Sequence, residues 1–146
     1  MKKALLTIGN TLRGDDGVGY ALGEQINKSG GWEVFHGEDC PENQINLIRA
    51  YGPDIVVIAD AVLGLDEGDA QFLDVTNEEM GMFNTHSIPI QYLIQFVQDF
   101  CESVLFLGIG VKYEKLLGIN MELSDEALGA VDNAVNLMHK FEEIIV

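Results

Sequence analysis

Cysteines and long hydrophobic runs are both scarce in this sequence. Its two cysteines, Cys40 and Cys101, lie far apart and form no CxxC pair, so we expect reduced thiols and a cytoplasmic protein. No stretch approaches about 18 consecutive apolar residues, and therefore no membrane-spanning segment is expected. The apolar residues after Met1-Lys2-Lys3 are too few for a signal peptide and are soon interrupted by polar residues.

Basic residues are scarce as well. Eight lysines and arginines stand against 24 aspartates and glutamates, which gives a formal net charge of −16. A surface this acidic repels nucleic acid and anionic membranes, so neither is an expected partner, whereas a basic protein segment is compatible with it. With 146 residues, and without repeats, low-complexity tracts or linkers, the chain is expected to form one domain over residues 1–146.

An unusual loop follows the first apolar segment, Leu5-Leu6-Thr7-Ile8. It breaks at Gly9-Asn10, presents the adjacent carboxylates of Asp15 and Asp16, and leads through glycines into a helical pattern. The two carboxylates would repel a phosphate at this helix start, and the glycines fit neither GxGxxG nor a P-loop. Carboxylates there suit a cation or a cationic group. One of them is expected to cap the helix, and capping alone is an open alternative.

Hydrophobic periodicity predicts alternating strands and helices. Strands are expected at about 5–8, 32–35, 54–61, 68–74 and 103–109, the fourth of them at an edge. Helices are expected at 18–28, after Pro41, from Ile90 to Cys101, and from Ser124 onward, where Leu128, Val131, Val135, Met138 and Ile145 form the apolar face. This order predicts a three-layer α/β/α sandwich with helices on both faces of the sheet.

Candidate ligands are expected to meet at one edge of this sheet. The first strand would lie between the second and the third, which puts the switch point, where α/β proteins bind ligands, between the first and third strands. Asp15 and Asp16 follow the first strand, and Asp60 ends the third, where a buried carboxylate must be paired or ligating. His86 precedes a helix that starts at the same edge, although a histidine there is more often structural. Two carboxylates and one imidazole suit a divalent transition metal.

Three segments carry a resemblance to a known family: Gly9-Asn10-Thr11-Leu12-Arg13-Gly14-Asp15-Asp16-Gly17-Val18-Gly19, Ile58-Ala59-Asp60-Ala61 and Thr85-His86. With them, the chain resembles the hydrogenase maturation endopeptidases, which trim the C-terminus of nickel–iron hydrogenase large subunits. The resemblance implies a five-stranded, mostly parallel sheet with one antiparallel strand in the edge region. It also implies a nickel-reading site at Asp16, Asp60 and His86. Cys40-Pro41-Glu42-Asn43 and the segment 85–94 are most similar to the branch serving formate-hydrogenlyase-type membrane hydrogenases.

The reaction implied by this resemblance is the cleavage of one peptide bond in a precursor that already carries nickel. The substrate's nickel would dock on Asp16, Asp60 and His86 and place the scissile bond nearby. No permanent cofactor is expected, zinc or cadmium can substitute in vitro, and the expected state is a monomer. Asp16 and Asp60 are also the candidate catalytic residues of an aspartyl-type endopeptidase. Activation of water by a carboxylate base and activation by the metal are both open.

Two other hypotheses about the function of these residues are open as well. No Ser–His–Asp set, HExxH motif or cysteine nucleophile is recognisable. A nickel-binding maturation chaperone would use the same site and bind the precursor without shortening it. A small-molecule α/β enzyme would use the loop of Asp15 and Asp16 for an amine or a sugar, and it would act without any hydrogenase precursor.

Overall fold

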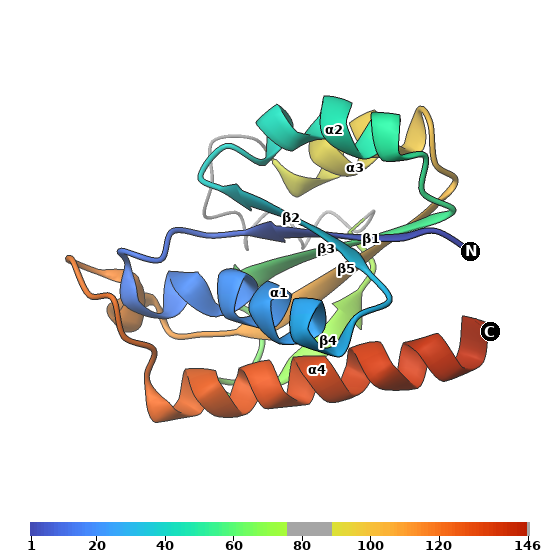
Figure 1. The fold of residues 1–146 in the computed structure, drawn as a ribbon. Coiled ribbons are helices and arrows are strands. Elements are labelled where there is room, and N and C mark those ends of the chain that lie inside the picture. Colours follow the sequence, from blue (N-terminus) through green and yellow to red (C-terminus); the bar gives the residue numbers. More distant parts are fainter. Residues whose placement is uncertain (76–88, 146) are drawn as a thin grey trace.

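A five-stranded sheet runs through the middle of the molecule (Figure 1). The computed structural model describes residues 1–75 and 89–145. The strands are β1 (Lys3–Ile8), β2 (Glu33–Glu38), β3 (Ile55–Val62), β4 (Ala70–Leu73) and β5 (Ser103–Gly110). Their order is β2-β1-β3-β5-β4, and only β4, at one edge, runs antiparallel to its neighbour. This confirms the mostly parallel sheet, and it confirms that β1 lies between β2 and β3.

Helices cover both faces of the sheet, as the sandwich prediction requires (Figure 1). One face carries α1 (Val18–Ser29) and α4 (Asp125–Ile145), and the other carries α2 (Ile45–Tyr51) and α3 (Ile90–Gln98). In the connections that the structure describes, short 3₁₀ turns lie at η1 (Gly14–Gly17), η2 (Pro41–Gln44) and η4 (Tyr113–Leu116). No helix among the described residues is long and apolar enough to cross a membrane.

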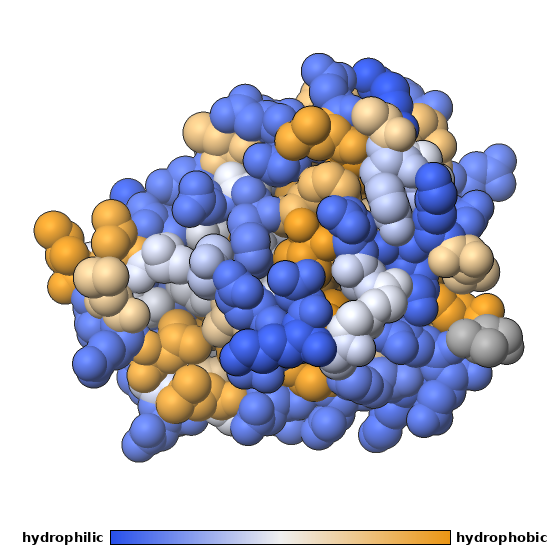
Figure 2. Space-filling model, in the orientation of Figure 1, coloured by the Kyte–Doolittle hydropathy of each residue, from blue (hydrophilic) through white to orange (hydrophobic). Residues whose placement is uncertain are grey.

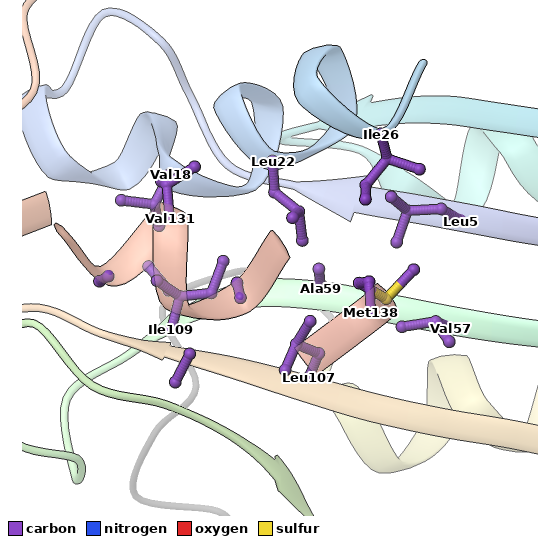
Figure 3. Close-up of a cluster of buried hydrophobic side chains, with 14 of the residues drawn as sticks. Leu5, Val18, Leu22, Ile26, Val57, Ala59, Leu107, Ile109, Val131 and Met138 are labelled. Carbon is purple, nitrogen blue, oxygen red and sulfur yellow. The ribbon is translucent and has the colours of Figure 1, made fainter. Parts of the chain in front are cut away.

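The strand β3 shows why the central sequence is a continuous apolar run. All of its residues are buried, because both faces of the strand are covered. Val57, Ala59 and Ala61 join the cluster under α1 and α4, which Figure 3 shows with Leu22 and Met138. The alternate residues, among them Val56, Ile58 and Val62, join a second cluster under α2 and α3. The two clusters together fix the faces to which β3 side chains point.

Two expectations about the helices are wrong. Leu128 does not belong to the buried face of α4, since it is 51% exposed. The buried face is instead made mostly of alanines, together with Val131 and Met138. Small alanine side chains let α4 lie close to α1 and the sheet, and this turns Leu128 toward solvent. In addition, α3 ends at Gln98, so Cys101 lies beyond the helix, although it is still buried.

Candidate functional site

The candidate site lies where β1 leaves the sheet and β3 continues. β1 pairs with β3 only as far as Thr7 and Ala59, whereas β3 stays paired with β5 up to Val62. Asp60 lies just past the last β1 partner and is only 6% exposed. Strand alternation puts its side chain on the same face as Ile58, toward α2 and α3. The strand β3 continues for two residues past Asp60, to Val62. Asp60 thus lies near the carboxyl end of the strand, whereas the sequence predicted that it ends the strand.

The turn η1 lies where the pairing of β1 with β3 ends, and it contacts β3. Its close approach depends on two glycines. Gly9 has φ +133°, and a Cβ there would overlap the backbone oxygen of Asp16. A Cβ at Gly19 would lie 2.5 Å from the carbonyl oxygen of Ile8 and 3.3 Å from that of Ala59. The glycines of the loop thus bring η1 and α1 onto the ends of β1 and β3, rather than around a phosphate.

Asp15 has a structural environment. Its carboxylate accepts hydrogen bonds from the Ser124 backbone N–H at 2.8 Å and from the Ser124 hydroxyl at 2.6 Å. The same hydroxyl oxygen accepts a hydrogen bond from the Ala127 N–H at 3.1 Å, so Ser124 is the predicted N-cap of α4. Asp15, which is 1% exposed, therefore joins η1 to the start of α4.

Neither carboxylate of the pair caps α1, contrary to expectation. The N-cap of that helix is Gly17, and the helix has no side-chain cap. The physical reason is the intervening turn η1, which places Asp15 and Asp16 one turn before the helix starts. Their carboxylates are used elsewhere, and the capping alternative for this pair is excluded.

Asp16 faces a different environment from Asp15. It is 3% exposed, and its Oδ2 accepts a hydrogen bond from the backbone N–H of Asn10 at 2.7 Å. The Asn10 side chain is itself held on two sides. Its Oδ1 accepts the Leu12 N–H at 2.8 Å, and its Nδ2 donates to Asp39 Oδ2 at 3.0 Å. Asp16 thus belongs to a hydrogen-bonded group that reaches the loop after β2.

The third predicted ligand, His86, lies outside the described residues, so a site that joins Asp16, Asp60 and His86 stays a prediction. Over residues 1–75 and 89–145, no group of three His, Cys, Asp or Glu side chains is close enough to hold a metal ion. The helix α3 begins at Ile90, four positions after His86. Ile90 is buried in the cluster that contains Val62, on the face of the sheet toward which Asp60 points.

A cavity of about 410 Å³ opens beside Asn10. One wall is the loop 10–12, and the other is formed by residues 36–40 with Asn43 and Gln44. A second cavity of about 350 Å³ shares Thr11 and Glu38 with the first. No role at the site is predicted for this polar loop from the sequence, although Cys40-Pro41-Glu42-Asn43 contributes to the family resemblance. A usable signal is that the loop follows β2, which runs parallel to β1. Because the carboxyl ends of parallel strands meet at one edge of a sheet, this loop is expected beside the loop that follows β1.

His36, in the wall of this cavity, has several defined contacts. Its Nδ1 lies 2.7 Å from the Thr7 hydroxyl, its ring stacks on Tyr20 at 4.2 Å, and its Nε2 lies 3.7 Å from Glu24. Burial lowers the pKa of the His36 imidazole, while the nearby carboxylates of Glu24 and Glu38 oppose that shift. These contacts make His36 a part of the β1–β2–α1 packing.

An exposed apolar loop borders the candidate site on its other side. Leu117, Ile119 and Met121 are 56%, 90% and 77% exposed. In the space-filling view, apolar groups project at the end of the molecule where the loop after η4 lies (Figures 1 and 2). Asn120 ties this loop to the site, because its N–H donates to Leu12 O at 2.8 Å and its carbonyl accepts the Gly14 N–H at 2.6 Å.

Comparisons with known proteins agree with this architecture. A family model described as hydrogenase maturation protease matches residues 18–140, a segment that contains Asp60 and His86 and begins two residues after Asp16. The hydrogenase 3 maturation protease of Escherichia coli (strain K12) is 39% identical over 113 residues, which cover 75% of this chain and 72% of that protein.

Solved structures give the same result. An uncharacterized protein from Wolinella succinogenes is similar with a TM-score of 0.84 and 35% identity, and the match covers 100% of both chains. The solution structure of an endopeptidase, HycI, from Escherichia coli is similar with a TM-score of 0.82 and 30% identity, over 97% of this chain and 92% of that one. The chain therefore belongs to the hydrogenase maturation protease family.

Proposed function

We propose that this chain is the endopeptidase that removes the C-terminal extension of a nickel-loaded nickel–iron hydrogenase large-subunit precursor. The observation that carries this proposal is the pair of buried carboxylates, Asp16 and Asp60, on two elements that contact each other at the open end of the sheet. Membership of the maturation protease family supports it independently. The name of the Escherichia coli relative, hydrogenase 3 maturation protease, supports a substrate of that hydrogenase class.

The substrate's nickel is the recognition element in this proposal. Asp16, Asp60 and His86 would contribute two carboxylates and one imidazole, a ligand set that suits nickel. Three protein ligands leave coordination positions for the groups that the precursor itself supplies. Docking of the metal would then fix the neighbouring peptide relative to the enzyme. In this scheme the enzyme holds no permanent metal of its own, and zinc or cadmium can take the place of nickel in vitro.

The catalytic step is proposed for the same carboxylates. The attacking water needs a proton acceptor, and Asp16 and Asp60 are the groups that we assign to an aspartyl-type mechanism. Activation of the water by the substrate's metal is the second route. The thiol of Cys101 does not favour a thiol mechanism, because it is buried in the apolar cluster under α3.

The surface around the site favours a protein substrate over a small molecule. Large exposed apolar side chains next to a site are typical of protein-binding surfaces, and Ile119 and Met121 lie on the loop that is tied to Leu12. The net charge of −16 is compatible with a basic or cation-bearing target. We further propose that the enzyme acts in the cytoplasm as a monomer, which the free thiols of Cys40 and Cys101 support for the compartment.

The proposal is tested by mass spectrometry of a purified, nickel-loaded precursor that has been incubated with this protein. An endopeptidase shortens the precursor at one bond and releases a single C-terminal peptide. A maturation chaperone would bind the precursor and leave its mass unchanged, and a small-molecule enzyme would do neither. Absence of cleavage with a folded protein would overturn the proposed function.

A further inference from the structure

Asn10 uses its backbone and both ends of its side chain to make hydrogen bonds. The backbone N–H donates to Asp16 Oδ2 at 2.7 Å, and the carbonyl accepts the Arg13 N–H at 3.1 Å. The side-chain oxygen accepts the Leu12 N–H, and the side-chain nitrogen donates to Asp39. One residue thus connects the loop after β1, the turn η1 and the loop after β2.

We infer that Asn10 is a positioning residue for Asp16, held in place by Asp39, and this inference rests on the proposed role of Asp16 as a nickel ligand. The N–H that reaches Asp16 belongs to the backbone, so its direction depends on the conformation of the loop 9–13. The Asn10 side chain fixes that conformation from within through Leu12 and from outside through Asp39. A carboxylate that is held by a hydrogen bond presents its oxygens to a cation in a defined direction.

Asparagine suits this position for a chemical reason. The position needs an acceptor for the Leu12 N–H and a donor for Asp39 on the same short side chain. Serine has a single oxygen and does not span both partners. Aspartate provides the acceptor, but it would place a second carboxylate at the 3.0 Å separation from Asp39 and repel it.

The surrounding loop has other anchors, so a change at Asn10 is expected to act locally. The Gly9 N–H donates to Glu38 O at 3.0 Å, and Leu12 O accepts the Asn120 N–H at 2.8 Å. Neither bond involves the Asn10 side chain. Loss of that side chain should therefore leave the fold intact and loosen only the segment that presents its N–H to Asp16.

The test measures binding of nickel(II) alone to the full-length protein by calorimetry. We expect Asn10→Ala to weaken nickel binding by about 10–100-fold, the usual cost of losing an outer-shell partner, with an unchanged thermal unfolding midpoint. The exchanged variant Asn10→Asp/Asp39→Asn keeps the net charge and one donor–acceptor pair, and it should bind within about threefold of the wild type. Asn43→Ala is the matched control, because Asn43 is an exposed asparagine in the wall of the same cavity, and it should bind like the wild type.

Wild-type affinity in Asn10→Ala, or an exchanged variant as weak as Asn10→Ala, would overturn the inference. So would a wild-type protein that binds no nickel. The calorimetry needs no precursor, so it is separate from the cleavage assay. If the wild type cleaves the precursor while Asn10→Ala binds nickel normally, the proposed function stands and the role of Asn10 is wrong. If nickel binding depends on Asn10 and the wild type does not cleave the precursor, the role of Asn10 stands and the proposed function is wrong.

Discussion

The turn η1 has two sides with different surroundings. On one side, Asp15 accepts two hydrogen bonds from Ser124 and fixes the start of α4. On the other side, Asp16 accepts the N–H of Asn10, next to the cavity that reaches the loop after β2. Both carboxylates are buried and they are adjacent in the chain. Their partners show that one belongs to the scaffold and the other to the candidate site, so stability and activity should respond separately to changes at the two residues.

The largest effect is expected on the side of Asp16 and Asp60. Asp16→Asn and Asp60→Asn keep the shape of each side chain and remove the negative charge that would bind the substrate's nickel. We expect a folded protein whose cleavage of nickel-loaded precursor falls by at least about 100-fold, the cost of losing substrate positioning. Mass spectrometry measures the cleavage, and circular dichroism checks the fold. A wild-type rate in Asp60→Asn would mean that the proposed site is wrong.

On the other side of the turn, Asp15→Ala should destabilise the protein. The change removes a buried carboxylate and leaves the Ser124 N–H without its partner. Hydrogen bonds to charged groups are worth about 1.5–3 kcal/mol each, so we expect a loss of roughly 3 kcal/mol in the free energy of unfolding. Urea denaturation measures it. Asp125→Ala, an exposed change in the first turn of α4, is the control and should stay within about 0.5 kcal/mol of the wild type.

The capping residue of α4 should give a smaller effect of the same kind. Ser124→Ala removes the hydroxyl that donates to Asp15 and accepts the Ala127 N–H, but it keeps the backbone bond to Asp15. Loss of a serine N-cap costs about 1 kcal/mol, and loss of one hydrogen bond to the carboxylate adds about 1.5 kcal/mol, so we expect roughly 2.5 kcal/mol in urea denaturation, somewhat less than for Asp15→Ala. If Ser124→Ala abolished cleavage without lowering stability, the assignment of this side of η1 to the scaffold would fail.

The smallest effect concerns pH. Burial lowers the pKa of His36 below its ordinary value of 6.5, so the unfolded chain binds more protons than the folded protein as the pH falls below that value. The free energy of unfolding should therefore decrease between pH 6.5 and the lower folded pKa, and it should be insensitive to His36 above pH 6.5. Comparing urea denaturation of the wild type and His36→Gln between pH 5 and 8 tests this, because the substitution should flatten the dependence.

The scaffold could be predicted largely from local patterns. The continuous apolar run of β3 indicates a strand with both faces buried, and the alternation of strands and helices fixes the layers. The predictions that failed depend on contacts between distant parts of the chain. Asp15 and Ser124 are 109 residues apart, so no local signal distinguished a link to α4 from a cap on α1. The face of α4 was misjudged because Leu128 outweighs an alanine in hydrophobicity, although the alanines allow the closer packing.

The candidate site shows the same limit. The position of Asp60 followed from the strand pattern, and that of Asp16 followed from the loop after β1. The hydrogen bond from Asn10 to Asp39 forms because β1 pairs with β2, which brings together the loops that follow the two strands. No local pattern in the sequence predicts this hydrogen bond. The place of His86 relative to the two carboxylates stays a prediction.

The most direct test of the central claim is a comparison of one precursor with and without nickel. If Asp16, Asp60 and His86 recognise a metal that the substrate carries, a nickel-free precursor offers the same peptide without those contacts. We predict that mass spectrometry shows one cleavage in the nickel-loaded precursor and none in the nickel-free form. Equal cleavage of the two forms would contradict the claim, because the enzyme would then recognise the peptide rather than the metal.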